Sequence, residues 1–257
     1  NVYFTGNYPF ISSTTYGQTV PEICLVTVDS TSMHNLVVWE KPISASIDSF
    51  LVYREVGSNY IQIGSVPYDS LSQYLDSDIG IDPNVTSYRY KIAQVDTCGN
   101  TSSLSDYHET IHLTANLGVN DEVNLIWDTY EGFSFGQYNI LRDSTFNGDW
   151  ELLGSVTFNN VSYSDFNPPL SGARYMIEVI PSTTCTSTKS VDHNSARSNR
   201  GGVVGVGSAP SSDFIANYTQ INVAGMVDFL DQSINNPTLW TWQFNGGSPT
   251  FSTQQNP

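Results

Sequence analysis

Residues 108–112 read His-Glu-Thr-Ile-His, a formal match to the H-E-x-x-H motif of zinc proteases. In those enzymes the motif lies on a helix, where residues four apart are about 6 Å from each other and chelate one ion. Here β-branched Thr110 and Ile111 lie inside the motif and favour a strand. On a strand the two histidines would stand about 13 Å apart and could not share a zinc ion. The motif is therefore predicted to be non-catalytic.

A second set of possible metal ligands is formed by Asp76, Asp78 and Asp82 in the stretch DSDIGID. Calcium loops begin with alternating carboxylates of this kind, because Ca²⁺ binds several oxygen ligands. Gly80 stands where such a loop has a third oxygen ligand, and the bidentate glutamate that should follow is absent. The sequence predicts a polar turn between strands, with a calcium site as the weaker alternative.

The rest of the sequence offers no other catalytic pattern. It lacks a nucleophile elbow, a phosphate loop and a Cys-x-x-Cys pair, and no Ser-His-Asp set can be argued from spacing. We therefore expect no catalytic residues, no enzyme activity and no cofactor other than the calcium ion considered above.

The charge balance limits the kinds of molecule that this chain can bind. Nine Lys and Arg stand against 25 Asp and Glu, for a formal charge of −16. Such a chain repels phosphate backbones and anionic membranes, so nucleic-acid binding is not expected. The sequence contains no apolar run long enough to cross a membrane, so membrane insertion is not expected either.

The elements that position these residues are predicted to be strands. The chain contains 15 Tyr, and Ser, Thr and Asn recur beside β-branched residues, which is typical of strands. No stretch keeps a helical period for more than about two turns. An all-β fold is therefore predicted.

The middle of the chain repeats itself at an offset of about 85 to 90 residues. With Trp39 placed over Trp127, NLVVWEKP at 35–42 corresponds best to NLIWDTYE at 124–131, FLVYRE at 50–55 to YNILRD at 138–143, and YRYKIAQV at 88–95 to RYMIEVI at 174–180. Each copy has about seven short alternating runs separated by turn residues, which is the pattern of a β-sandwich. Four aromatic residues at matching strand positions are predicted to be core: Trp39, Trp127, Tyr90 and Tyr175.

The order of these motifs resembles the fibronectin type III domain, an immunoglobulin-like sandwich, in two tandem copies. ICLVTVD, VDTCGN and LSDYHETIHL are similar to phrases in large secreted and surface proteins of the Bacteroidota, many of which are exported with a C-terminal sorting domain by type IX secretion. The resemblance covers about residues 21–204 and implies an extracellular or cell-surface location. We expect domains at 21–113 and 114–200, preceded at 1–20 by an extension or the tail of another domain.

A Gly- and Ser-rich stretch at 201–212 is predicted to be a linker. The following residues, 213–257, resemble the first part of a PKD domain, another small β-sandwich, through VDFLDQS at 227–233, PTLWTWQF at 237–244 and GGSP at 246–249. Members of that family continue for about thirty more residues. We therefore expect this chain to be part of a longer protein.

The sandwich topology also implies a pairing for the cysteines. Cys24 opens the first strand of the first copy and Cys98 follows its penultimate strand, at the same pole of such a sandwich. A Cys24–Cys98 disulfide is predicted, against the alternative of two buried thiols. Cys185 has no partner in its own copy, and a free thiol, a buried thiol and a bond outside the chain stay open.

Three functions are compatible with these features. The first, which we favour, is a non-catalytic structural or adhesive array that acts as a spacer and attachment module beside other domains of its parent protein. The second is an accessory region of a secreted hydrolase or peptidase whose catalytic domain lies elsewhere. The third is a module that binds glycans or surface proteins, for which YEGFSFGQY at 130–138 is the main aromatic candidate.

Overall fold

The computed structural model describes residues 19–182, 193–203, 212–218, 220, 225–233, 237 and 239–257. All regular secondary structure in these ranges is β, which confirms the predicted all-β fold class. Across the same residues no helix has the length and hydropathy needed to span a membrane. Most of the predicted N-terminal extension, residues 1–18, lies outside the described residues.

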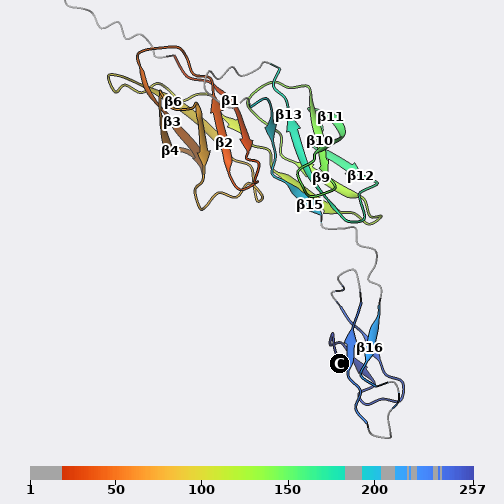
Figure 1. Ribbon diagram of the computed structural model, residues 1–257. Helices are drawn as coiled ribbons and strands as arrows, with labels where there is room; N and C mark the ends of the chain where they lie inside the picture. The colour runs from red at the N-terminus through yellow and green to blue at the C-terminus, as the bar shows by residue number, and fades with distance from the viewer. Residues whose placement is uncertain are drawn as a thin grey trace, which may run out of the picture. The chain divides into compact units, whose positions relative to one another are not determined.

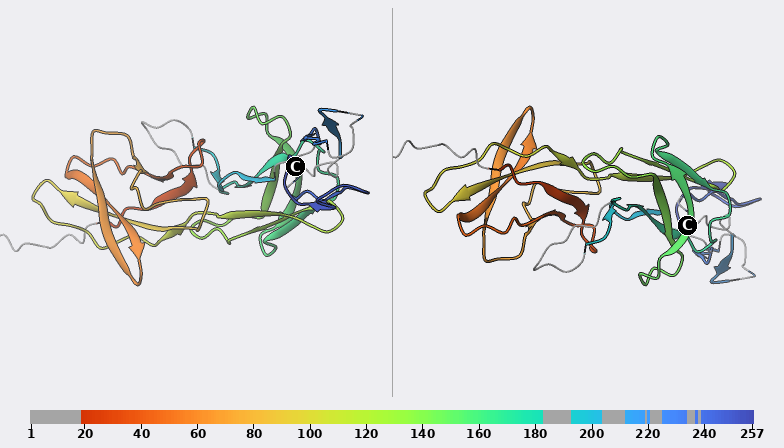
Figure 2. Two further views of the ribbon diagram at one scale, coloured as in Figure 1. Left: turned by 90° about the horizontal axis from the view of Figure 1, so that it is seen from below. Right: turned by 90° about the horizontal axis from the view of Figure 1, so that it is seen from above.

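The first sandwich consists of seven strands in two sheets (Figures 1 and 2). One sheet has the order β1-β2-β5 and the other the order β4-β3-β6-β7, and all pairs are antiparallel. This three-plus-four arrangement is that of an immunoglobulin-like sandwich. The strands are β1 (Ile23–Val28), β2 (Asn35–Trp39), β3 (Ile47–Val56), β4 (Asn59–Pro67), β5 (Gln73–Asp76), β6 (Arg89–Asp96) and β7 (His108–Glu109).

The second sandwich repeats this order. One sheet is β12-β9-β8, and the other is β11-β10-β13-β14, with β15 also pairing with β13. In the described part of the chain, β8 to β15 pair only with one another, as β1 to β7 do. The strands are β8 (Leu113–Leu117), β9 (Val123–Trp127), β10 (Gln137–Asp143), β11 (Glu151–Thr157), β12 (Ser162–Asp165), β13 (Ala173–Val179), β14 (Ala196–Arg197) and β15 (Gly201–Val203).

Strand alternation builds the two cores around equivalent aromatic residues. Trp39 and Trp127 are both buried, and each packs against an aromatic ring of the opposite sheet at a centroid distance of 5.4 Å, Phe50 in the first sandwich and Tyr138 in the second. Tyr90 and Tyr175 are completely buried on β6 and β13, and the predicted core role of all four residues is confirmed.

A buried polar lock ties the two sheets of the first sandwich together. Asp76 at the end of β5 is 1% exposed and accepts hydrogen bonds from Arg54 Nη1 at 2.9 and 2.7 Å and from the hydroxyl of Tyr90 at 2.7 Å. Asn35 Nδ2 donates to the same hydroxyl at 3.0 Å. Burial and the neighbouring carboxylate raise the pKa of Tyr90 well above its ordinary value, so the phenol stays a donor.

The second sandwich contains the same lock at the repeat-related positions. Asp165 accepts from Arg142 Nη1 and from the Tyr175 hydroxyl, each at 2.9 Å. Val123 stands where the first copy has Asn35, so the tyrosine hydroxyl loses its second partner. A buried carboxylate is stable only when it is paired and hydrogen-bonded, and both copies meet this condition in the same way.

Strand β15 falls inside the stretch that was predicted as a linker from residue 201 onward. Gly201–Val203 pairs with β13 through Ala173–Tyr175, so the linker prediction is wrong for these three residues. A Cβ on Gly201 would meet Leu113 at 3.1 Å, which explains why a residue without a side chain occupies this strand. Residues 204–211 lie outside the described residues.

Residues 213–257 form two short hairpins of their own. β16 (Phe214–Ala216) pairs with β17 (Phe229–Asp231), and β18 (Trp242–Gln243) pairs with β19 (Phe251–Ser252). Phe214, Phe229, Trp242 and Phe244 contact one another at centroid distances of 5.1 to 6.2 Å. None of the described residues in this segment is buried.

By its contacts, the chain divides into two compact units. Unit 1 comprises residues 1–112, 128–136 and 178–199, and unit 2 comprises residues 113–127, 137–177 and 200–257. Unit 1 therefore contains the first sandwich together with the 128–136 loop and a later segment. The possible functional features described next belong to unit 1.

Candidate binding pocket

The H-E-x-x-H residues do not form a metal site. His108 and Glu109 are the two residues of β7, the last strand of the first sandwich, and not part of a helix. Glu109 accepts hydrogen bonds from Arg89 Nε at 2.7 Å and from the Ser87 hydroxyl at 2.8 Å. His112 Nε2 lies 3.1 Å from the carbonyl of Asn84. Each side chain of the motif therefore has separate partners.

The three aspartates predicted as the weaker calcium alternative bind different partners. Arg54 binds Asp76 as described above, and its Nη2 donates to Asp78 at 3.0 Å. Asp82 instead accepts from the backbone and the side chain of Asn84, both at 2.9 Å. Arginine thus supplies the positive charge that calcium would have brought. Among the described residues, no group of three or more His, Cys, Asp or Glu side chains is arranged to hold a metal ion.

The cysteines depart from the predicted pairing. Cys24 on β1 is disulfide-bonded, whereas Cys98 is a free and exposed thiol, so the predicted Cys24–Cys98 bond is wrong. Asp96 stabilises the turn that carries Cys98, because its carboxylate accepts a hydrogen bond from the Cys98 amide at 2.9 Å. The turn therefore needs no disulfide. Cys185, the third cysteine of the chain, lies outside the described residues.

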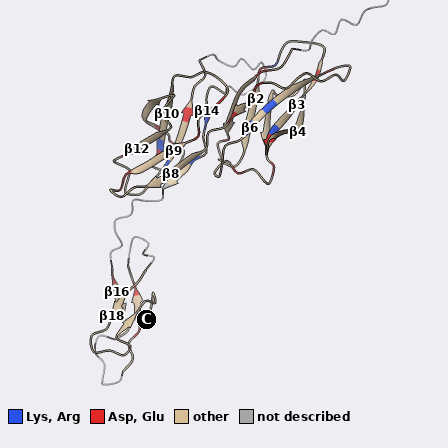
Figure 3. Ribbon diagram, turned by 180° about the vertical axis from the view of Figure 1, so that it is seen from behind, with Lys and Arg blue, Asp and Glu red and all other residues tan. Residues whose placement is uncertain are grey.

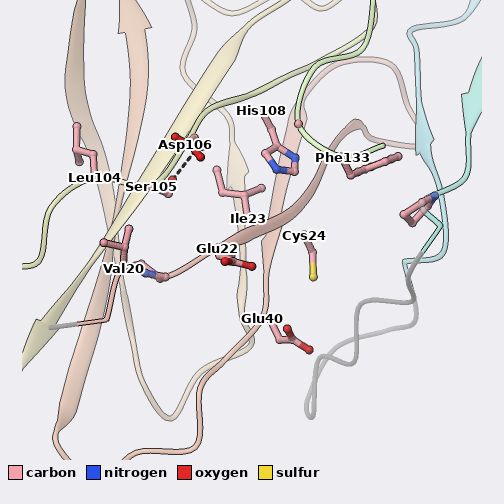
Figure 4. Close-up of a pocket in the computed structure, with 13 residues that line it drawn as sticks. Val20, Glu22, Ile23, Cys24, Glu40, Leu104, Ser105, Asp106, His108 and Phe133 are labelled. Carbon is pink, nitrogen blue, oxygen red and sulfur yellow. Dashed lines mark hydrogen bonds between the residues drawn. The ribbon is translucent and has the colours of Figure 1, made fainter. Parts of the chain in front are cut away.

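Unit 1 contains a pocket of about 510 Å³ next to the disulfide-bonded Cys24 (Figure 4). Its size is in the range of small-ligand sites. Three carboxylates, one imidazole and several apolar side chains line it, and it has no lysine or arginine among the described residues. The polar lining side chains are Glu22, Glu40, Ser105, Asp106 and His108, and the apolar ones include Val20, Ile23, Leu104, Phe133 and Pro181.

His108 joins the pocket to an aromatic cluster. Its Nδ1 lies 3.1 Å from the hydroxyl of Tyr130, and its ring packs edge-on against Tyr130 and Phe133 at centroid distances of 6.1 and 6.2 Å. Gly132 has φ +144°, and a Cβ there would lie 2.3 Å from the imidazole, so the close approach of this loop requires glycine. Burial lowers the pKa of His108 to about 4, against an opposing effect of Asp106, and the ring is neutral at pH 7.

The aromatic loop at 130–138 is thus used for packing. Tyr130 is buried and its hydroxyl accepts the amide of Val26 at 3.4 Å, while Phe133 and Phe135 pack against its ring. The sequence could not show that His108 is the partner of this loop, because the two are far apart along the chain.

The described basic residues of the chain, marked in blue in Figure 3, have partners within the protein. Eight of the nine lie in the described residues, and each has an acidic, carbonyl or aromatic partner. They are Lys41, Arg54, Arg89, Lys91, Arg142, Arg174, Arg197 and Arg200. Arg89, for example, binds Glu109 at 2.7 Å, lies 3.6 Å from Glu55 and stacks over Tyr107.

Comparison with solved structures finds chains of similar structure. The chain is similar to the crystal structure of the FN1–FN3 domains of chicken CNTN1, with 12% sequence identity and a TM-score of 0.32. The alignment covers 73% of this chain and 66% of that chain, just under two thirds of it. No protein-family model and no curated protein matches this chain. The fold assignment rests on the strand order and register described above.

Proposed function

We propose that this chain is a non-catalytic structural array, in which two fibronectin type III-like sandwiches space and attach parts of a large secreted or surface protein. The observation that carries this proposal is the repeated lock of tyrosine, aspartate and arginine. A spacer needs modules that resist unfolding. A buried ion pair with a tyrosine hydrogen bond joins the two sheets of each sandwich at the same place.

The charge distribution supports a role away from nucleic acids and anionic surfaces. Five of the eight described lysines and arginines form ion pairs with carboxylates of the protein, so little positive charge is left among them to attract a polyanion. The large excess of acidic residues stays available to solvent, divalent cations or basic partners.

The disulfide at Cys24 supports an extracellular or cell-surface location. Disulfides form and persist mainly in oxidising compartments and are rare in the cytosol. This agrees with the resemblance of the sequence to secreted and surface proteins of the Bacteroidota.

For residues 213–257 we propose the first part of a PKD-like sandwich. Its aromatic residues contact one another but stay partly exposed, as expected of a sandwich core that further strands would cover. Leu239 and Phe251 are 88% and 55% exposed, which is unusual for large apolar side chains in a completed sandwich.

Isolation of the intact protein from its native source, with peptide mapping beyond Pro257, tests the proposal. A longer chain made of further sandwich domains is the expected result. A hydrolase or peptidase domain on the same chain would overturn it and make these sandwiches accessories of an enzyme.

A further inference from the structure

The states of two cysteines determine the partner of the disulfide-bonded Cys24. The sequence contains three cysteines. Cys24 on β1 is disulfide-bonded, whereas Cys98 is a free and exposed thiol. The third cysteine is Cys185. A disulfide that Cys24 makes within this chain can therefore only be made with Cys185.

The described residues that precede Cys185 in the sequence lie beside Cys24. Pro181 lines the same pocket as Cys24, whose side chain Figure 4 shows. Cys185 is four residues further along the chain, and four residues span at most about 14 Å. This reach exceeds the width of a compact space of about 510 Å³, which is about 10 Å. The chain is therefore long enough to bring Cys185 from Pro181 to Cys24.

The residues that follow Cys185 also contact the first sandwich. Nε2 of His193 lies 3.2 Å from Oε1 of Gln73 on β5. The amide of Arg197 on β14 donates to the hydroxyl of Thr27 at 2.9 Å, and Thr27 is on β1, three residues after Cys24. These residues all belong to unit 1. The chain thus contacts this unit both before and after Cys185.

We propose that Cys24 forms its disulfide with Cys185 and that this bond fastens the segment between β13 and β14 to β1. The bond forms by thiol–disulfide exchange with an oxidised dithiol or glutathione disulfide. One thiolate attacks that disulfide, and the second displaces the mixed disulfide. The two cysteine thiols are thereby oxidised, and the oxidant leaves as two thiols. This pairing does not depend on the spacer function, which stands or falls separately.

The first test is a tryptic peptide map of the unreduced chain, with free thiols blocked before digestion. Trypsin cleaves after Lys and Arg but not before Pro, so the three cysteines fall in separate peptides, 1–54, 92–142 and 175–189. We expect one linked pair, made of 1–54 and 175–189, and an alkylated 92–142. A link between 1–54 and 92–142, or between the 1–54 peptides of two chains, would overturn the proposal, as would an unlinked 175–189.

Two variants provide matched controls. Cys185→Ser should release the Cys24 thiol, so that an alkylating reagent labels Cys24 as well as Cys98 without reduction. Cys98→Ser removes the exposed thiol instead and should leave Cys24 unlabelled. A Cys24 that stays unlabelled in Cys185→Ser, or that becomes labelled in Cys98→Ser, contradicts the pairing.

The bond also has a mechanical consequence that stretching of single molecules measures. It closes a loop of about 160 residues, which cannot extend until the disulfide is reduced. At about 3.5 Å per residue, the fully stretched oxidised chain should be about 56 nm shorter than the reduced one. Cys185→Ser should reach the full length without reductant. An oxidised parent chain that extends as far as the reduced chain would overturn the proposal.

Discussion

The polar lock of the first sandwich predicts an unequal response to the same substitution in the two copies. Tyr90→Phe removes a hydroxyl that donates to Asp76 at 2.7 Å and accepts from Asn35 at 3.0 Å. A hydrogen bond to a charged group contributes about 1.5–3 kcal/mol, and the buried amide of Asn35 would lose its acceptor as well. We expect a loss of about 3 kcal/mol in the free energy of unfolding of the first sandwich.

The equivalent substitution Tyr175→Phe removes one bond, to Asp165, and no amide is left without its acceptor because Val123 replaces Asn35. We expect a loss of about 2 kcal/mol, about 1 kcal/mol less than in the first copy. Tyr53→Phe is a matched control, because Tyr53 is a half-buried residue whose hydroxyl makes no hydrogen bond within the described residues.

Urea unfolding followed by hydrogen exchange separates the two effects. Peptides from β2 and β6 report the first sandwich, and peptides from β9 and β13 report the second. Equal losses in the two copies, or a larger loss for Tyr175→Phe, would refute the assignment of the extra stability to Asn35. A loss in the Tyr53→Phe control as large as in Tyr90→Phe would refute the lock itself.

Three further results are expected. Without reduction, an alkylating reagent should label Cys98 and leave Cys24 unlabelled, as mass spectrometry of the peptides would show; labelling of both would contradict the disulfide. Gly132→Ala should destabilise unit 1 by about 2–4 kcal/mol because its Cβ meets the imidazole, whereas Gly57→Ala, also at positive φ but in open space, should cost about 1 kcal/mol in denaturant unfolding. The pKa of His108, lowered from 6.5 to about 4, means that the folded state binds fewer protons than the unfolded state between these values. Stability should therefore fall by up to about 3 kcal/mol as the pH drops through this window, and His108→Gln should flatten the dependence.

The repeat was the most informative feature of the sequence. It predicted the sandwiches and the buried positions of Trp39 and Tyr90, because alternation and spacing are local properties of strands. Arg54 and Asp76 also recur in the second copy, as Arg142 and Asp165, and this recurrence was the available signal for the lock. The calcium interpretation considered only neighbours in sequence, whereas the partner of Asp76 is 22 residues away on another strand.

The pocket and the disulfide could not be predicted in the same way. His108 and Phe133 come together only because the 128–136 loop packs in unit 1, and no sequence period encodes that contact. The predicted Cys24–Cys98 disulfide was wrong because two cysteines at the same pole of a sandwich are not necessarily within bonding distance of each other. Gly201 and Gly202 resemble a linker in composition, although together with Val203 they pair with β13 like any other strand.

Single-molecule stretching of the whole chain under reducing conditions, so that the disulfide of Cys24 does not limit the extension, tests most directly the central claim that it is a spacer built of two locked sandwiches. The account predicts discrete unfolding steps of about 30 nm for the strands between residues 23 and 109 and about 32 nm for those between residues 113 and 203, at about 3.5 Å per residue. Tyr90→Phe should lower the force of the first of these steps and leave the second unchanged. Extension without discrete steps would contradict the claim.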